Sequence, residues 1–267
     1  MTAEPDLAIL RSLCERVARE AGRLLRNGMT RTDIQVEAKR TETDLVTEMD
    51  RASEALITQR LIEWRPDDGI LGEEGAYRDG TSGVRWIVDP LDGTTNYLYG
   101  LSGFNVSIGV EVNEQPAAGA VYDIVRDELF SASRGGGATR NGETIQTTSA
   151  RHLPHALVGT GFSYEPRQRR HQAEVLVTLL PKVRDIRRQG AAALDLCSVA
   201  CGRLDAYYEQ GLSPWDVAAG GLIAIEAGAA VTNLAGDAVT AGTVVAAAPG
   251  IAPALRSLLQ SAGATDA

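Results

Sequence analysis

The feature that most constrains this chain is a short apolar run that leads directly into two aspartates. The run Trp86-Ile87-Val88 consists of residue types that favour strands, and Asp89-Pro90-Leu91-Asp92-Gly93-Thr94-Thr95-Asn96 follows it. Pro90 fixes φ and removes a backbone donor, and Asp92-Gly93 permits a tight turn. We therefore expect a buried strand that ends abruptly at Val88, with both carboxylates at its mouth.

This arrangement of oxygen atoms suits a magnesium ion. Mg²⁺ prefers a few carboxylates together with water and substrate phosphate, and the Leu91 carbonyl adds an oxygen between the two aspartates. The N–H groups of Gly93, Thr94 and Thr95 could open a helix and hold an anion. Because Pro-x-Asp-Gly after a strand is also an ordinary turn, a turn without metal stays open at this point.

Length and charge limit the size of the domain and the partners that the protein can bind. The 267 residues fit one large domain or two tightly packed halves. No apolar stretch approaches the ~18 residues of a membrane helix, and the acidic start at 1–6 is unlike a secretory or transit signal, so we expect a cytoplasmic protein. The net charge of −9 opposes direct contact with nucleic acid or an anionic membrane unless a local basic patch overrides it.

The cysteines and histidines offer no competing chemistry. Cys14, Cys197 and Cys201 contain no CxxC pair, which argues against a disulfide framework and a zinc site. The three histidines lie in or beside polar, Arg-rich segments, away from the carboxylates. A phosphatase that relies on histidine is therefore disfavoured.

The hydrophobic pattern divides the chain into two halves with different organisation. Helical spacing predicts helices over 6–27 and 47–64, and alternating short runs from 104 to 145 predict an antiparallel meander with a hairpin turn at Asn141-Gly142. After residue 155 strands and helices interleave. We expect one layered α+β domain over 1–267, with sub-halves of about 1–150 and 151–267, the second a mixed α/β part.

The pattern also gives bounds for the single elements. The expected meander strands are 105–112, 117–124 and 128–132. In the second half we expect strands at 156–162, 204–209, 229–234 and 244–248, helices at 168–184, 191–201 and 215–227, and a final helix.

Three further acidic segments lie at the ends of predicted elements. The short strand 70–72 runs into Glu73-Glu74-Gly75, Asp216 lies near a helix start, and Thr47-x-x-Asp50 has the form of a capping box. Each alone has an ordinary explanation as a solvated turn or a helix cap. Together with the two aspartates, four separate segments supply acids.

These segments give the chain a resemblance to a known family. Glu73-Glu74-Gly75, Asp89 to Asn96 and Trp215-Asp216-Val217-Ala218-Ala219-Gly220 are similar, in order and approximate spacing, to the signature motifs of the inositol monophosphatase family. The likeness extends from Asp44 to Gly228 and is greatest to the bacterial inositol-1-monophosphatase branch. It implies the layered α-β-α-β-α sandwich of metal-dependent sugar phosphatases, hydrolysis of inositol 1-phosphate, a homodimer and inhibition by lithium.

The resemblance also implies roles for individual residues. Two Mg²⁺ ions, or three with a weaker one near Glu73, would be bound, with Asp89 as the bridge between the two main ions. A water molecule oriented by Glu73 and Thr94 would attack phosphorus, and Asp50 would hold Thr94 in place. The first ion would be held by Glu73, Asp89 and the Leu91 carbonyl, and the second by Asp89, Asp92 and Asp216.

Substrate contacts follow from the same resemblance. The N–H groups of Gly93 and Thr94 would receive the phosphate, and Lys39 is a candidate for a long-range phosphate or metal-loop contact, although a lone lysine is more often a surface charge. The polyol would meet Asp216, Glu209 and the turn Gly190-Ala191-Ala192; a carboxylate accepts two hydroxyl hydrogen bonds well. Ala191 departs from the Ser or Thr common in the family, which puts polyol selectivity in doubt.

Two other functions stay open. The same chemistry could act on histidinol phosphate, fructose bisphosphate or a nucleotide phosphate, because relatives in the wider superfamily do so. Alternatively, the chain could be a binding protein that acts through partners in a transcription complex. For the homodimer, the apolar meander of residues 104–132 is the expected interface.

Overall fold

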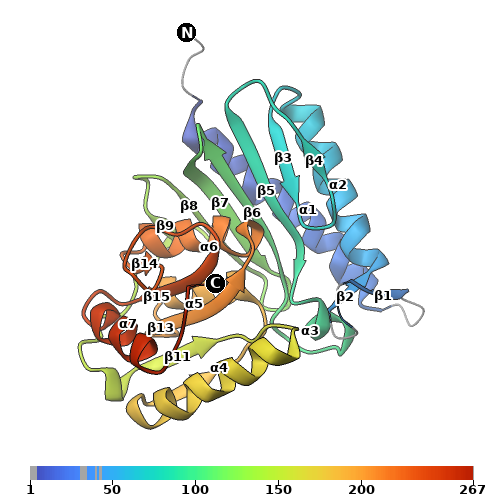
Figure 1. Cartoon of the computed structure of the whole chain (residues 1–267). Coiled ribbons are helices and arrows are strands. Elements are labelled where there is room, and N and C mark those ends of the chain that lie inside the picture. Colours follow the sequence, from blue (N-terminus) through green and yellow to red (C-terminus); the bar gives the residue numbers. More distant parts are fainter. Residues whose placement is uncertain (1–4, 31–34, 40, 42–43, 267) are drawn as a thin grey trace.

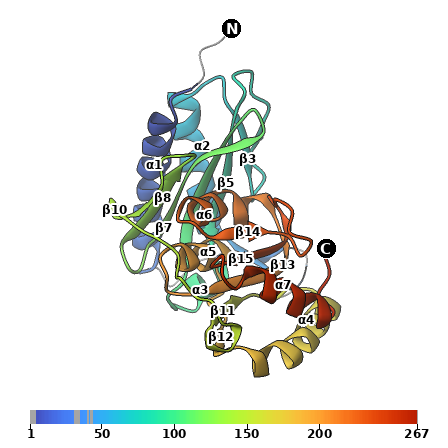
Figure 2. The same ribbon diagram turned by 90° about the vertical axis from the view of Figure 1, so that its left-hand side faces the viewer.

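Five layers of secondary structure build the protein, in the order helices, sheet, helices, sheet, helices. The computed structural model describes residues 5–30, 35–39, 41 and 44–266, so most of the acidic start of the chain and part of the segment between Lys39 and Val46 lie outside the described residues. Figure 2 shows the layers nearly edge-on, with α1 and α2 on one side and α4 and α7 on the other. The expected α-β-α-β-α sandwich is confirmed.

The first helical layer contains α1 (Leu7–Gly28) and α2 (Glu48–Trp64). The Asp6 side chain caps α1 by accepting a hydrogen bond from the Ala8 N–H at 2.9 Å. The residues of α1 that repeat at helical spacing are buried against the first sheet, as an amphipathic helix requires. These buried residues are Leu10, Cys14, Val17, Ala18, Ala21 and Leu25.

The first sheet is the antiparallel meander extended to eight strands, in the order β10-β9-β8-β7-β6-β5-β3-β4. All neighbouring strands are antiparallel except β3 and β5, which are parallel. Asn141 and Gly142 have φ values of 51° and 82°, which makes the β9–β10 turn the predicted hairpin. The strands are β3 (Gly69–Gly72), β4 (Tyr77–Arg78), β5 (Val84–Asp92), β6 (Asn105–Val112), β7 (Gln115–Asp123), β8 (Glu128–Ser133), β9 (Ala138–Arg140) and β10 (Glu143–Thr144).

The strand that carries the aspartates does not end where the sequence pattern predicts. β5 continues through Pro90 to Asp92, and its pairing with β6 shifts register between Asp89 and Asp92. Proline has no N–H to donate to a sheet, so this irregular stretch accommodates it. The correction matters because both carboxylates belong to a distorted strand end that remains anchored to β6.

The second sheet lies between two helical layers and has mixed strand directions. Its order is β12-β11-β13-β15-β14, with parallel pairing among the first three strands and antiparallel pairing of β15 with both neighbours. Side chains on β13 alternate between the two faces: Tyr207 packs with the middle helices and Tyr208 with the outer ones. The strands are β11 (Leu157–Thr160), β12 (Asp185–Arg187), β13 (Ala206–Leu212), β14 (Ala230–Thr232) and β15 (Gly242–Ala247).

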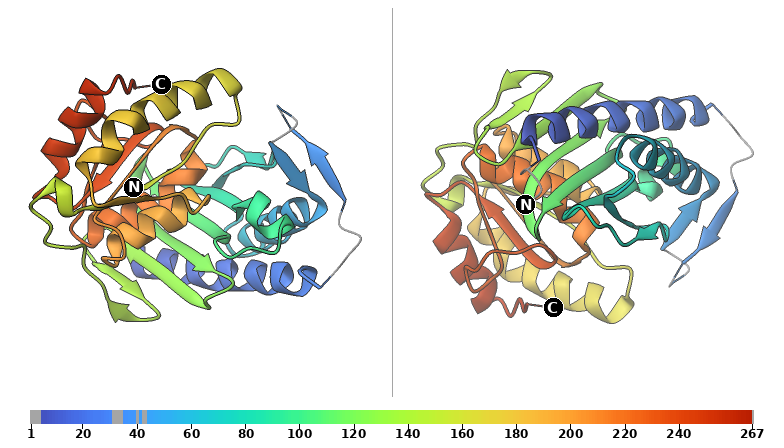
Figure 3. Two further views of the ribbon diagram at one scale, coloured as in Figure 1. Left: turned by 90° about the horizontal axis from the view of Figure 1, so that it is seen from below. Right: turned by 90° about the horizontal axis from the view of Figure 1, so that it is seen from above.

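The remaining helices cover the two faces of this second sheet (Figure 3). α5 (Ala192–Ala200) and α6 (Pro214–Glu226) fill the layer between the sheets, whereas α4 (Pro166–Leu179) and α7 (Ala252–Ser261) lie on the outside. Figure 1 shows the short helix α3 (Thr94–Leu98) beside the hairpin of β1 (Val36–Ala38) and β2 (Leu45–Thr47). We did not predict this hairpin from the sequence.

The helix expected at 168–184 is shorter than predicted. α4 ends at Leu179, a 3₁₀ turn spans Leu180–Lys182, and the chain then enters β12, which was not predicted. Pro181 explains the early end, because proline lacks the N–H that would continue the helix.

The strands of the meander, which we expected to supply a dimer interface, are largely covered within the single chain. Every residue of β6 is buried within the single chain, and β7 and β8 are buried almost throughout. α1 covers one face of these strands and α6 packs against the other, so the protein's own helices already occupy this apolar surface. None of the described helices is long and apolar enough to cross a membrane.

Candidate active site

One cavity of about 340 Å³ gathers nearly all the residues singled out in the sequence. It lies where the distorted end of β5, the start of α3, the N-terminal ends of α5 and α6 and strand β13 meet. Asp50 is the one predicted site residue that does not line it. The predicted residues that do are Lys39, Glu73, Asp89, Leu91, Asp92, Gly93, Thr94, Gly190, Ala191, Ala192, Glu209 and Asp216.

Asp89 is the most deeply buried carboxylate of the cavity, with 2 % of its surface exposed. The Leu91 N–H donates to its Oδ1 at 3.1 Å, which fixes the side chain at the irregular part of β5. Burial raises the pKa of Asp89 well above its ordinary value, and the nearby charges of Glu73, Asp92 and Asp216 raise it further. A buried acid surrounded by other acids favours a cation as its neighbour.

Asp92 links the two halves of the molecule. Its Oδ2 accepts hydrogen bonds from Asn105 Nδ2 at 2.8 Å on β6 and from the Ala193 N–H at 2.9 Å in the first turn of α5. Burial raises the pKa of Asp92 to about 6, although these two donors counteract the rise. The N-terminal end of α5 is thereby attached to the strand that carries both aspartates.

Asp216 enters the cavity from the first turn of α6. The Ser213 N–H donates to its Oδ2 at 2.6 Å, and Ser213 and Asp216 together form a capping box. Burial raises the pKa of Asp216 well above normal, and the negative charge of Asp92 adds to the effect. The helix cap therefore also serves to place a carboxylate opposite the β5 aspartates.

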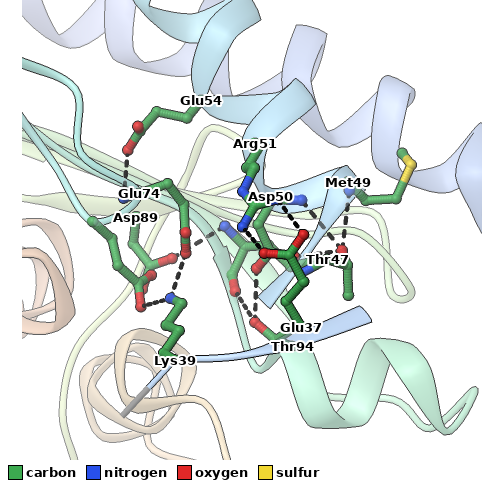
Figure 4. Close-up of polar contacts among 12 residues, drawn as sticks. Glu37, Lys39, Thr47, Met49, Asp50, Arg51, Glu54, Glu74, Asp89 and Thr94 are labelled. Atoms are coloured by element: carbon green, nitrogen blue, oxygen red, sulfur yellow. Dashed lines mark hydrogen bonds and ion pairs between the residues drawn. The ribbon is translucent and has the colours of Figure 1, made fainter. Parts of the chain in front are cut away.

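Glu73 and Glu74 meet a lysine from the β1–β2 hairpin, and Figure 4 shows this lysine, Lys39, beside Glu74. Lys39 Nζ lies 2.9 Å from Glu73 Oε1 and also pairs with Glu74 Oε1. Burial alone would lower the pKa of Lys39, but the two glutamates outweigh it and raise the pKa. Glu54 supports this turn from α2, because its carboxylate accepts the N–H groups of Glu74 and Ala76 at 2.8 and 2.9 Å.

Thr94 and Asp50 form a second polar group at the edge of the cavity, also visible in Figure 4. The Thr94 hydroxyl lies 2.8 Å from Asp50 Oδ1 and 3.1 Å from the Leu91 carbonyl oxygen. The other Asp50 oxygen accepts from the Thr47 N–H at 2.9 Å. Because Thr94 donates its single proton in this way, its oxygen lone pairs can accept a hydrogen bond from a molecule in the cavity.

The opposite wall of the cavity is suited to hydroxyl groups. Tyr207 donates its hydroxyl to Glu209 Oε2 at 2.5 Å, which leaves the second carboxylate oxygen free of this bond. Burial raises the pKa of Glu209 to about 7, and the Tyr207 hydrogen bond and the Arg188 charge each offset part of the rise. Gly190 has a φ of 89° and begins the turn into α5.

The donor set fits hard divalent cations. Carboxylates and a backbone carbonyl, with no sulfur or imidazole among the cavity residues, are the ligands that Mg²⁺ prefers. Several acids in one buried place also carry an excess of negative charge that a cation would neutralise. As the side chains of the described residues stand, no three His, Cys, Asp or Glu converge closely enough to hold a metal; Lys39 pairs with Glu73 instead.

Sequence reasoning missed several residues of this site. Glu54, Asp195 and Arg188 carry no distinctive motif, although Arg188 lies two positions before the Gly190 turn and could have been found from that spacing. Asp195 is buried in α5 and accepts a hydrogen bond from Gln189 Nε2 at 3.0 Å, which braces the start of the same turn.

Comparisons with known proteins agree on one family. The model of the inositol monophosphatase family matches residues 6–264. An inositol-1-monophosphatase of Mycobacterium bovis is 46% identical over 95% of this chain and 94% of its own length, and a Nus factor SuhB of Pasteurella multocida is 41% identical over 92% and 93%.

Solved structures give the same result. The extragenic suppressor protein suhB of Bartonella henselae superposes with a TM-score of 0.90 at 36% identity, covering 95% of this chain and 98% of that one. The protein named SaIMPase-II, solved with inositol monophosphate bound, has a TM-score of 0.81 at 28% identity, with 96% of each chain covered.

Proposed function

Since this chain belongs to the inositol monophosphatase family, we propose that it is a Mg²⁺-dependent phosphomonoesterase that hydrolyses inositol 1-phosphate to inositol and phosphate. The observation that carries the proposal is the single cavity that collects acids from β5, α6 and the β3–β4 turn beside the Thr94–Asp50 pair. The inositol monophosphate bound to SaIMPase-II supports this substrate class.

The carboxylates are assigned as ligands of two or three cations. Glu73, Asp89 and the Leu91 carbonyl would hold one Mg²⁺, and Asp92 and Asp216 would hold a second that shares Asp89. Bound there, the cations would neutralise the phosphoryl oxygens and the leaving alkoxide and acidify a water molecule. Lys39 would have to release Glu73 for this arrangement, since the two are paired at 2.9 Å.

The protein's own groups orient the reactants. Thr94, held by Asp50, would accept a hydrogen bond from the attacking water, and Glu73 would take up its proton. The N–H groups of Gly93 and Thr94 would receive the phosphate, with Lys39 as a more distant positive charge. The polyol hydroxyls would meet Glu209, Asp216 and the turn Gly190-Ala191-Ala192, where Ala191 offers no hydroxyl of its own.

Phosphate release from inositol 1-phosphate tests the proposal directly. We expect release that depends on Mg²⁺ and is lost in Asp89→Asn, because the substitution removes a negative charge from the centre of the carboxylate group. Circular dichroism should show an intact fold in the variant. Substantial activity of Asp89→Asn, or histidinol phosphate turning over at least about a hundredfold better than inositol 1-phosphate, would contradict it.

The family resemblance adds two finer parts to the proposal, a homodimer and inhibition by lithium. Light scattering on the purified protein measures the first, and titration of LiCl against phosphate release measures the second. The strands of the meander are largely buried within the chain, so of residues 104–132 the exposed turns at 113–115 and 125–127 are the parts open to a partner.

A second function is supported by the names of relatives. The Pasteurella multocida protein is a Nus factor, and this chain covers 93% of it. We propose that a role in a transcription complex accompanies catalysis. Asp89→Asn should then still co-elute with purified transcription-complex proteins in gel filtration, whereas loss of both properties would show that the two are not separable.

A further inference from the structure

An arginine outside the family motifs lines the active-site cavity. Arg188 follows β12 and precedes the Gly190 turn, and it is one of two basic residues among the described residues that line the cavity. The other is Lys39, whose charge is balanced by Glu73 and Glu74. The positive charge of Lys39 is therefore already neutralised by neighbouring acids, unlike that of Arg188.

The Arg188 guanidinium is free to bind a ligand. Across the described residues, no hydrogen bond or ion pair ties it to another side chain or to the backbone, and the side chain is exposed. Its neighbour Arg187, by contrast, pairs with Asp185 at 2.6 Å. An arginine without a fixed partner at the wall of a cavity can form two parallel hydrogen bonds to a phosphate or carboxylate.

Its position places it on the side of the leaving group. A Cβ atom on Gly190 would collide with Arg188 Nη1, so the guanidinium lies directly over the turn assigned to the polyol. Burial raises the pKa of Glu209, and the Arg188 charge offsets part of this rise, as the Tyr207 hydrogen bond does to a larger extent. Arg188 and Glu209 therefore face the same part of the cavity.

The segment of the chain that ends at Arg188 is rich in basic residues, although the chain as a whole is acidic. Residues 151–188 contain eight of the 26 basic residues but only three of the 35 acids. Arg169, in the first half of α4, donates to the carbonyl of the cavity residue Ser163 at 3.3 Å, which places a second arginine at the cavity rim. This segment therefore brings positive charge to one side of a cavity whose other walls carry acids.

We propose that Arg188 selects substrates that carry a second anionic group on the alcohol part, such as a sugar bisphosphate. This inference deepens the proposed phosphatase function and rests on it. The scissile phosphate would lie at the carboxylate cluster, while the second phosphate would bind the Arg188 guanidinium and the hydroxyls would bind Glu209. Ala191 fits the same interpretation, because a smaller residue at the turn leaves more room for a charged substituent.

The reaction itself is unchanged by this selection. Water adds to phosphorus, the bond from phosphorus to the alcohol oxygen breaks, and the alcohol leaves with a proton. The second phosphate keeps its ester bond and acts only as a binding group. Its contribution should therefore appear mainly in KM rather than in kcat.

A matched pair of substrates tests the inference. Fructose 1-phosphate and fructose 1,6-bisphosphate share the sugar and the scissile ester and differ in the second phosphate. We expect kcat/KM of the wild-type protein to be at least about tenfold higher for the bisphosphate, and Arg188→Met to bring the ratio close to one by raising KM for the bisphosphate. Arg188→Lys should restore part of the preference, because the charge returns without the forked geometry.

Arg187→Met is the matched control. It removes an arginine at the adjacent position, but that arginine is paired with Asp185 and does not line the cavity, so the ratio should stay as in the wild type. A wild-type ratio near one, or equal losses on both substrates in Arg188→Met, would overturn the inference and leave the phosphatase proposal intact. Absence of phosphate release from fructose 1-phosphate, fructose 1,6-bisphosphate and inositol 1-phosphate alike would overturn both.

Discussion

The helices α2 and α6 begin with the same local motif but use it for different purposes. Thr47-x-x-Asp50 and Ser213-x-x-Asp216 are both capping boxes. In each, the aspartate accepts a hydrogen bond from the N–H of the cap residue, at 2.9 Å in α2 and 2.6 Å in α6. A capping box therefore gives a carboxylate a fixed position at a helix start and commits one of its two oxygens.

The two aspartates differ in what lies beside their second carboxylate oxygen. In Asp50 it accepts from the Thr94 hydroxyl, and the side chain is fully buried behind the cavity wall. Asp216 instead lines the cavity and faces Asp92, whose charge raises its pKa beyond the effect of burial. Asp50 therefore acts through another residue, whereas Asp216 is placed to meet the ligand itself.

The largest effect should follow from Asp216→Asn. The asparagine oxygen can still accept the Ser213 N–H, so the helix cap should survive, but the negative charge towards the cavity is lost. We expect phosphate release to fall by roughly a thousandfold or more, since that corresponds to ~4 kcal/mol of lost stabilisation at a metal site. Thermal unfolding should show a fold as stable as the wild type, and activity within tenfold of it would remove Asp216 from the ligand set.

Asp50→Asn should have a smaller effect of a different kind. If the asparagine oxygen accepts the Thr47 N–H, its NH₂ group faces Thr94, which must then act as acceptor instead of donor. We expect kcat to fall about 10- to 100-fold, the range found when a supporting partner of a metal site is removed.

Two further variants isolate the role of the Thr94 hydroxyl in that prediction. Thr94→Ser keeps the hydroxyl and should retain most of the activity, whereas Thr94→Val should match or exceed the loss of Asp50→Asn. Equal activity of Thr94→Val and the wild type would contradict the assigned chain of contacts.

The smallest expected effect concerns the pH dependence of stability after metal removal with EDTA. Burial is the largest cause of the raised pKa of Asp50, Asp216, Asp92 (about 6) and Glu74 (about 7). The folded state therefore holds more protons than the unfolded state, and the free energy of unfolding should fall as the pH rises from about 4.5 through about 7. Melting temperatures at pH 5, 6, 7 and 8 measure this.

The two capping aspartates should differ in this experiment as well. Burial raises the pKa of both residues, but hydrogen bonds from Thr47 and Thr94 offset part of the rise for Asp50, whereas the charges of Asp92, Glu73 and Glu209 add to it for Asp216; Asp216→Asn should therefore flatten the pH dependence more. Added Mg²⁺ should restore stability at pH 7 and above, because a ligand that binds only the folded state stabilises it. Melting temperatures that rise with pH in EDTA would contradict the assignment.

Much of the fold followed from periodicity, and the exceptions have identifiable causes. The bounds of β6 agree with the prediction, and α1 differs from it by one residue at each end, because a long amphipathic helix and an alternating strand each repeat their signal many times. The end of α4 and the strand β12 were missed, since one proline and a three-residue strand carry little periodic information. β5 was cut short because Pro90 reads as a strand breaker, whereas the register shift accommodates it.

The residue types of the site could be found without a structure: two aspartates after a strand, one capping box, a further acid near a helix start, an acidic turn and no competing histidine or cysteine set. Contacts between distant segments place Asp216 in the cavity and Asp50 behind Thr94, and among the described residues they leave Arg188 without a hydrogen bond or ion pair over the Gly190 turn. The physical reason is that a local motif fixes the backbone and one hydrogen bond. The direction of the remaining oxygen or guanidinium depends on contacts between segments far apart in the chain.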